Sequence, residues 1–212
     1  MESGRPRALA IAQAAALFAA FSSPSPAACS IGQDIRVSIQ RGKEGFILEG
    51  RFTSPATPEQ AWRVLTDYEA IPSFIRSMSA SRVLKRSDGF IYLFQKSRAG
   101  FFLFRHTISL LLKVKETAPK QIGFSDVSGK SFKSYQGSWE IAPLADGVGV
   151  VYRVRAEGGL ADGDWLSGLV AKWTAESLLE GVCNEMRLKA TPFVIPAAPS
   201  ARRGAASPPS LE

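Results

Sequence analysis

The chain has 212 residues, of which 45% are hydrophobic and 21% charged, and its formal net charge is +7. These values are ordinary for a globular domain and argue against disorder over most of the length. Two cysteines and one histidine argue against a disulfide scaffold and a multi-histidine metal centre, and we expect neither a metal nor a cofactor. The positive surplus favours anionic surroundings but identifies no partner.

Residues 1–27 have the features of a secretory signal peptide. Two arginines precede an apolar run from Ala8 to Phe21, and the small residues Ser25 and Ala27 suit cleavage after Ala27. We therefore expect an exported protein, either periplasmic or secreted. The alternative is an uncleaved anchor, although the run is shorter than the roughly 20 residues that a spanning helix needs.

Cys29 stands just after the expected cleavage site, in residues 28–32, which we expect to be a flexible N-terminus. Lipid anchoring at Cys29 is one interpretation, but Pro26 and Ala28 make a poor acylation motif. Cys183 is expected to behave as a small buried hydrophobic residue. Because Cys29 lies on a segment predicted to be mobile, we do not expect a disulfide between the two cysteines.

One domain is expected at residues 33–193, because residues 194–212 are rich in Pro, Ala and Ser and predict a disordered tail. The domain opens with two stretches, 35–40 and 46–53, in which apolar residues alternate with polar ones. A period of two residues predicts half-buried strands.

The segment after these strands predicts a short helix. Thr57 is a suitable N-cap, Pro58 suits the first helical position, and Gln60 completes a capping box. Pro72 is expected to end or interrupt this helix.

A long β region follows at residues 81–157, with its clearest strands at 104–115, 132–141 and 148–157. Apolar and polar side chains alternate in each of them, which is typical of an antiparallel sheet with one wet face. The last element, from about residue 164 to 190, is predicted to be helical, with apolar side chains on more than one side.

This order of elements predicts an α+β fold. Strands are followed by short helices, about five further antiparallel strands and one long C-terminal helix. A curved sheet must cover its apolar face, and the terminal helix is the one long cover that the sequence predicts. A gap remains between helix and sheet wherever side chains fail to fill it.

Several segments resemble the START-like, helix-grip (SRPBCC) superfamily, and within it the coenzyme Q-binding and polyketide cyclase/dehydrase-type proteins. The resemblance rests on residues 50–52, 54–62, the D-Y-x-x-x-P-x-F pattern at 67–74, and the G-x-W-x-x-x-P pattern at 137–143. It implies a curved sheet gripping the C-terminal helix and a hydrophobic pocket between the two. Members of the superfamily hold lipids, quinones, sterols or polyketides in this pocket, and some of them cyclise their substrates.

The faces expected to point inward collect aromatic and apolar residues that predict a ligand site. The candidate ligand-binding residues are Phe101, Phe102, Phe104, His106, Phe124, Tyr135, Trp139, Tyr152, Leu169 and Trp173. The alternative is a solid core in which the rings only bury their own area.

If the protein is an enzyme, His106, Tyr135 and Tyr152 are the candidates to polarise carbonyls and move protons. The alternatives are a strand-end histidine bonded to the backbone, and tyrosine hydroxyls at the rim of a core. A cyclase or dehydratase acting on a polyketide-like substrate is therefore one hypothesis, beside a non-catalytic carrier of a hydrophobic small molecule or lipid.

The apolar run 101–104 follows Lys96 and Arg98 and suits either contact with an anionic membrane or a lid over the cavity. A third hypothesis is therefore a membrane- or protein-docking module whose core is filled by its own side chains. Along the sequence the basic residues are dispersed and the outward aromatic residues form no obvious stripe, so we expect no nucleic-acid partner.

Overall fold

The computed structural model describes residues 28–158, except 31, 33, 44, 102 and 103, and residues 168–190. This part of the chain forms one eight-stranded sheet and three helices. The elements in chain order are β1 (Ile35–Arg41), β2 (Gly45–Ser54), α1 (Pro58–Thr66), α2 (Ile71–Phe74), β3 (Met78–Ser87), β4 (Phe90–Phe101), β5 (Phe104–Thr117), β6 (Gln121–Asp126), β7 (Ser134–Leu144), β8 (Gly147–Glu157) and α3 (Gly168–Ala190).

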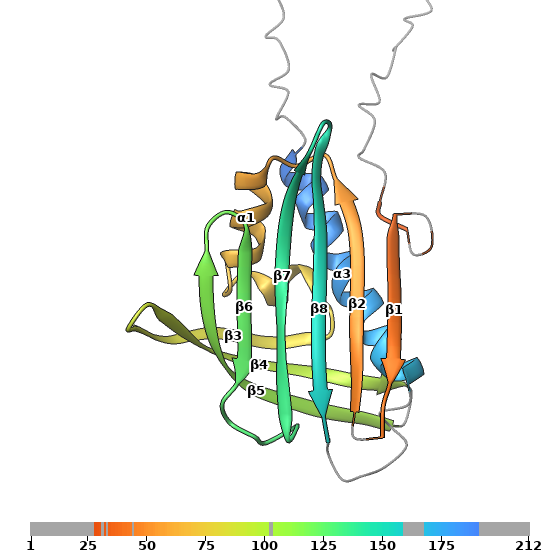
Figure 1. Ribbon diagram of the computed structural model, residues 1–212, viewed down its shortest axis with the longest axis vertical. Coiled ribbons are helices and arrows are strands. Elements are labelled where there is room, and N and C mark those ends of the chain that lie inside the picture. Colours follow the sequence, from red (N-terminus) through yellow and green to blue (C-terminus); the bar gives the residue numbers. More distant parts are fainter. Residues whose placement is uncertain are drawn as a thin grey trace, which may run out of the picture.

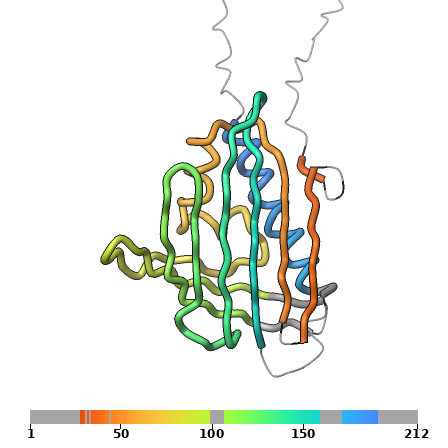
Figure 2. The backbone as a smooth tube through the Cα atoms, viewed as in Figure 1, coloured from red at the N-terminus to blue at the C-terminus, as the bar shows by residue number. Residues whose placement is uncertain are grey.

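The sheet is antiparallel throughout, with the strand order β1-β2-β8-β7-β6-β5-β4-β3. Figure 1 shows β1, β2, β7 and β8 along the long axis of the molecule, whereas β3, β4 and β5 cross its lower part. The sheet is therefore strongly curved, and the backbone tube in Figure 2 follows this bend. The helices lie on the concave side. The expected helix-gripping α+β fold is confirmed, with six strands rather than about five after the short helices.

The alternation in the sequence correctly identifies which face of each strand points inward. In β2, Leu48 and Phe52 are buried, whereas Ile47 and Arg51, which directly precede them, are exposed. In β8, buried Val150 alternates with half-buried neighbours in the same way. The buried residues of both strands face the concave side, where burial of apolar area stabilises the fold.

The capping box at the start of α1 is formed as predicted. Thr57 Oγ1 accepts a hydrogen bond from the Gln60 N–H at 3.2 Å, and Gln60 Oε1 accepts one from the Thr57 N–H at 2.8 Å. Pro72 does not end this helix, because α1 already ends at Thr66. It lies instead in the first turn of α2, where a missing N–H leaves no helical hydrogen bond unmade.

Two glycines allow α3 to pack closely against its neighbours. A Cβ atom on Gly50 of β2 would overlap the side chain of Leu179 on α3. A Cβ atom on Gly181 of α3 would lie 2.6 Å from the carbonyl oxygen of Phe74 in α2. The C-terminal half of α3 is therefore fixed against both β2 and α2.

Cys29 and Cys183 form a disulfide, so the expectation that they stay apart is wrong. Cys29 is only 2% exposed, and its N–H donates to Asn184 Oδ1 at 2.7 Å. An ion pair of 2.9 Å between Arg187 and Asp34 holds the same segment. These contacts dock the residues before β1 on α3, and sequence patterns do not reveal such contacts. The disulfide also occupies the sulfur that a lipid anchor on Cys29 would use.

Candidate ligand cavity

A cavity of about 180 Å³ lies between the concave face of the sheet and the helices. This is an order of magnitude more than the roughly 10–15 Å³ that one water molecule requires. Its wall is mainly apolar and includes residues from α1, α2, α3 and the seven strands β2 to β8. The lining residues on the strands are Phe46, Leu48, Met78, Leu93, Gln95, Ser97, Ile108, Leu110, Leu112, Val114, Ile122, Phe124, Tyr135, Trp139, Tyr152 and Val154.

The position of the hollow follows from the side chains that α3 presents to the sheet. Ala171, Thr174 and Ala175, in the N-terminal half of the helix, line the cavity. Further along, Leu179 and Met186 are fully buried at 0% exposure. Leu178 and Val182 also line the cavity, so the small residues widen it at the N-terminal half of α3, and the interior is not filled by its own side chains.

Aromatic rings from β6, β7, β8 and the β6–β7 connection form one wall of the cavity. The ring centroids of Trp139 and Tyr152 lie 4.3 Å apart, and those of Phe132 and Tyr135 lie 5.1 Å apart. Phe124 stacks on both tyrosines at 6.0 and 6.2 Å. Rings this close pack against one another, so they form one aromatic surface on this side of the cavity.

A pair of tyrosine hydroxyls lies within this aromatic wall. Tyr135 on β7 and Tyr152 on β8 bring their oxygens to 3.2 Å. Tyr152 is buried and Tyr135 half-buried. Removal from water raises the pKa of both phenols, so both stay protonated at neutral pH. They can therefore donate hydrogen bonds to a ligand, but they are poor bases.

A second polar group stands where α1 ends. The hydroxyl of Tyr68, which lines the cavity, donates to Glu116 Oε1 on β5 at 2.7 Å. Burial and the neighbouring carboxylate raise the pKa of Tyr68. Because this hydroxyl already has its acceptor, Tyr68 closes one side of the cavity rather than presenting a donor to it.

Four of the ten predicted ligand-binding residues line the cavity: Phe124, Tyr135, Trp139 and Tyr152. Trp173 does not, and its prediction is corrected here, because its side chain on α3 is 46% exposed. Helical spacing alone placed it beside inward residues, but α3 turns this position away from the sheet. Ligand binding by the four lining residues stays a prediction.

The other predicted residues lie where the structure does not describe the side chains. Phe102 falls outside the described residues. The backbone places Phe101 opposite Phe104 and His106 opposite Ala99 in the β4–β5 pairing, and Leu169 in the first turn of α3, but nothing is described of these four side chains. Their proposed contacts with a ligand stay predictions, as does the membrane or lid role of the run 101–104.

Sequence reasoning missed several lining residues. Phe132 lies two residues before β7 begins, and alternation in the predicted strand 132–141 places it on the face opposite Tyr135, so the periodicity does not point to it. Gln95 and Ser97 of β4 continue the inward row that Leu93 occupies. These two polar residues interrupt an otherwise apolar inward row. Their position could have predicted a polar site, because a polar residue that points inward needs a partner or a ligand. Gln95 Nε2 has such a partner in Ser81 Oγ at 3.3 Å.

The described residues offer no group of three or more His, Cys, Asp or Glu side chains arranged to hold a metal ion. None of the helices in the described ranges has both the length and the hydropathy needed to cross a membrane.

Comparison with known proteins identifies a matching family and several solved structures of similar fold. Residues 54–183 match the family of polyketide cyclases/dehydrases and lipid transport proteins. A STAR-related lipid transfer protein from Xanthomonas axonopodis is similar in structure, with a TM-score of 0.61, 20% identity, and coverage of 76% of this chain and 98% of that one. The Zhui aromatase/cyclase from Streptomyces sp. R1128 has a TM-score of 0.59 at 12% identity, covering 74% and 97%.

Human STARD10 is also similar, with a TM-score of 0.57, 13% identity, and coverage of 72% of this chain and 69% of that one. At these identities the likeness shows the fold alone. No curated protein sequence gives a significant match.

Proposed function

The chain belongs to the family of polyketide cyclases/dehydrases and lipid transport proteins, and we propose that it binds and carries a hydrophobic small molecule of lipid, quinone or polyketide-like chemistry. The observation that carries this proposal is the cavity of about 180 Å³ beneath α3, with its mainly apolar wall. A ligand gains about 0.8 kcal/mol for each methylene moved from water into such a wall. The few polar groups of the cavity then orient the molecule.

The carrier acts outside the cytoplasm in this proposal. The predicted signal peptide, residues 1–27, supports export. The disulfide between Cys29 and Cys183 supports it independently, because disulfides persist in oxidising compartments and are rare in the cytosol.

Uptake of ligand by the delipidated protein tests the carrier function. Native mass spectrometry of the protein incubated with fatty acids, ubiquinone or aromatic polyketides should detect a one-to-one complex. Ala175→Phe places a ring in the cavity beside α3 and should abolish the complex. Ala142→Phe makes the same change at an exposed position of β7 and should bind normally. The absence of any complex with the wild-type protein, or equal binding by both variants, would refute the proposal.

A second candidate function is cyclisation or dehydration of a polyketide-like chain in the same cavity. The tyrosine pair favours it, because a protonated hydroxyl can polarise a carbonyl held against the aromatic wall. Turnover of a poly-β-ketone thioester should then fall in the variant Tyr135→Phe/Tyr152→Phe. Full turnover in His106→Phe would remove His106 from the mechanism.

A further inference from the structure

The hydroxyl pair of Tyr135 and Tyr152 contains one more donor than it can use. Each hydroxyl has a single hydrogen to donate. One hydrogen lies between the two oxygens, which are 3.2 Å apart, and the other is left over. No other described residue forms a hydrogen bond with either hydroxyl. The leftover hydrogen therefore lacks an acceptor within the described protein.

The surroundings make this leftover donor significant. Both tyrosines line the cavity, and their ring neighbours Phe124, Phe132 and Trp139 accept no conventional hydrogen bond. An O–H group removed from water without an acceptor is destabilising. A ligand oxygen placed against the pair would supply the acceptor, whereas a hydrocarbon of the same shape would not.

Resting on the carrier function above, we propose that the tyrosine pair selects apolar ligands with an acceptor oxygen, such as a ketone or quinone carbonyl. Fluorenone and fluorene test it, because they share one ring system and differ in a carbonyl against a methylene. Equilibrium dialysis gives the ratio of their dissociation constants for the wild type and for Tyr135→Phe/Tyr152→Phe. The double variant is needed because either single variant retains one donor.

The preference for fluorenone should fall about fivefold in the double variant, as expected for one hydrogen bond. Comparing ratios between proteins cancels the different water solubilities of the two probes. The carbonyl stretching band of fluorenone bound to the wild type should also shift to lower frequency. Binding of both probes with an unchanged ratio, or no infrared shift, overturns this inference and leaves the carrier function standing. Failure of the wild type to bind either probe counts against both.

A second inference rests on the opposite, convex side of the sheet. Residues of β4 and β5 that alternate with the cavity-lining ones point outward, and the shifted register of β3 sets Arg82 and Lys85 opposite the outward residues Phe94 and Tyr92. Folding gathers cations there that are dispersed along the sequence. The basic β3–β5 face consists of Arg82, Lys85, Lys96, Arg98, Lys113 and Lys115. The described part of this face contains no carboxylate, and none of the six forms an ion pair with a described residue.

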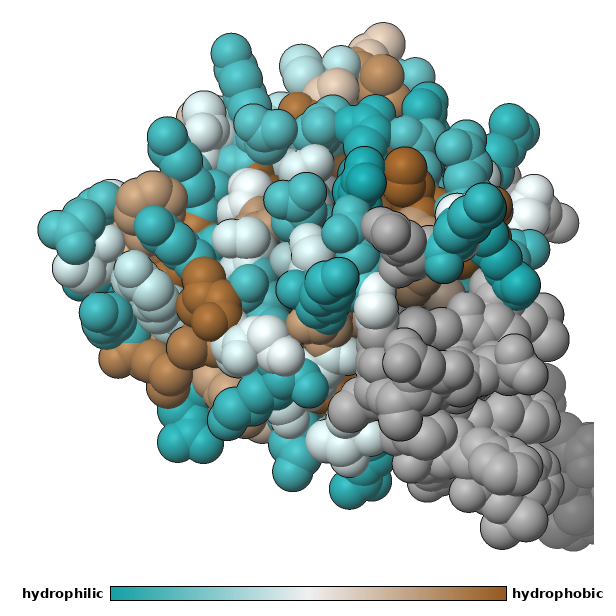
Figure 3. Space-filling model, turned by 60° about the horizontal axis from the view of Figure 1, so that its bottom comes forward, coloured by the Kyte–Doolittle hydropathy of each residue, from teal (hydrophilic) through white to brown (hydrophobic). Residues whose placement is uncertain are grey.

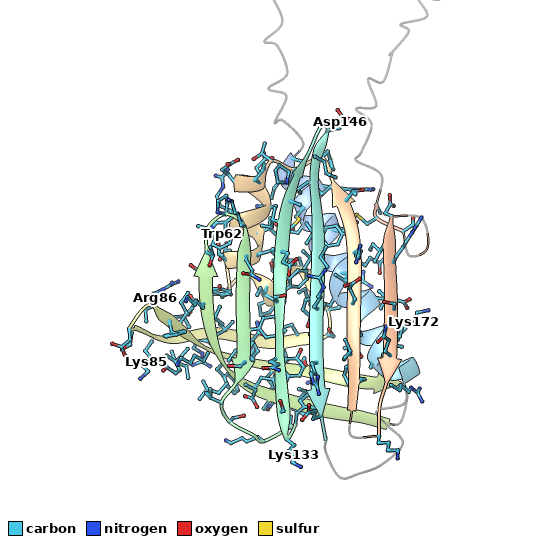
Figure 4. The ribbon with its side chains drawn as sticks, in the orientation of Figure 1. Trp62, Lys85, Arg86, Lys133, Asp146 and Lys172 are labelled. Atoms are coloured by element: carbon cyan, nitrogen blue, oxygen red, sulfur yellow. A yellow bond between two sulfur atoms is a disulfide. The ribbon has the colours of Figure 1, made fainter. Side chains whose placement is uncertain are left out.

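Aromatic rings are interleaved with these cations. The Lys85 ammonium lies 4.5 Å from the centroid of Tyr92, and that of Lys113 lies 3.9 Å from the centroid of Phe90. Figure 4 shows Lys85 on the β3–β4 hairpin, which extends beyond the rest of the sheet. Leu84 beside it is 55% exposed, and Figure 3 shows hydrophobic side chains among hydrophilic ones on this side of the molecule.

The other half of the convex side is close to electrostatic balance, because among its described outward arginines only Arg36 on β1 forms no ion pair with a described carboxylate. Arg153 forms ion pairs with Glu49 at 2.8 Å and with Glu140 at 2.6 Å. Arg51 also pairs with Glu49, and Arg155 pairs with Glu157. The unbalanced charge is therefore a local property of β3, β4 and β5 and does not simply reflect the net charge of the chain.

We propose that the basic β3–β5 face docks the protein on an anionic phospholipid bilayer. Cations interleaved with aromatic and aliphatic side chains suit the headgroup region. A carrier of an apolar molecule, as proposed above, also exchanges that molecule with a bilayer. Single-stranded nucleic acid is less suited, because it stacks bases on open rings, whereas ammonium groups cover Phe90 and Tyr92.

Vesicle co-sedimentation tests this surface. The protein should bind phosphatidylcholine vesicles containing phosphatidylglycerol, but not phosphatidylcholine alone, and raising the salt from about 0.1 M to about 1 M should release it. Lys96→Gln/Lys115→Gln should weaken binding about fivefold for each charge removed. Arg51→Gln/Arg155→Gln removes two charges from the balanced half and should have little effect. Equal loss in both variants, no vesicle binding, or tighter binding to a single-stranded oligonucleotide overturns the proposal.

Discussion

Loss of the disulfide between Cys29 and Cys183 should strongly destabilise the fold. The two cysteines are separated by 154 positions, so the cross-link closes nearly the whole domain into one loop. For a loop of this length, the chain-entropy relation gives about 5 kcal/mol, at the upper end of measured disulfide contributions. The contribution comes mainly from the unfolded chain, which loses more freedom when it is cross-linked.

The native structure should survive reduction, because other contacts dock the same segment. The Cys29 N–H bonds to Asn184, and Asp34 pairs with Arg187. Urea unfolding of the oxidised and reduced protein should therefore begin from the same native circular dichroism spectrum. With a denaturant slope of about 2 kcal/mol per molar urea, the loss of about 5 kcal/mol should lower the midpoint of the reduced protein by about 2.5 M.

The variant Cys29→Ala/Cys183→Ala is the matched control. It should unfold near the midpoint of the reduced protein and should not respond to reductant. The reasoning is refuted if reduction leaves the wild-type midpoint unchanged, or if the oxidised native protein contains two titratable thiols.

Three further changes test the packing and electrostatics of the fold. Gly181→Ala brings a methyl group to 2.6 Å from a carbonyl oxygen of α2 and should lower the free energy of unfolding by about 1–3 kcal/mol. Hydrogen bonds from the Ser30 backbone and then Arg187 lower the pKa of Asp34 below 3.8. Its stabilising effect is therefore present above that pH and lost as the pH falls through the folded value, and Asp34→Asn should flatten this acid dependence of the urea midpoint. Tyr68→Phe leaves Glu116 without its donor and should cost about 1–2 kcal/mol in thermal unfolding.

The fold was predictable because local signals agree with the tertiary structure. Thr57 and Gln60 form a capping box from side chains three residues apart, which the sequence displays directly. Alternation of apolar and polar residues in a strand also reports burial directly, as in β2 and β8. Such signals need no knowledge of what lies opposite each residue.

The candidate site was less predictable because it depends on contacts across long sequence separations. The disulfide required Cys29 to dock on α3, and the sequence gives no pattern for that docking. Trp173 followed the helical spacing of inward residues, yet the packing of α3 leaves it 46% exposed. The tyrosine pair depends on the register of β7 against β8, in which Trp139 lies opposite Tyr152. No single strand reveals that register.

The hollow itself depends on a short stretch of α3. Ala171 and Ala175 line the cavity, while Leu179 of the same helix fills the space above Gly50. The same sheet would thus enclose a solid core if the N-terminal half of α3 carried larger residues. The C-terminal half, fixed by the disulfide and the contact of Gly181 with α2, keeps the helix in place across the empty space. Because the C-terminal half of α3 is held firmly, the small side chains of the N-terminal half can leave a cavity without collapse of the fold.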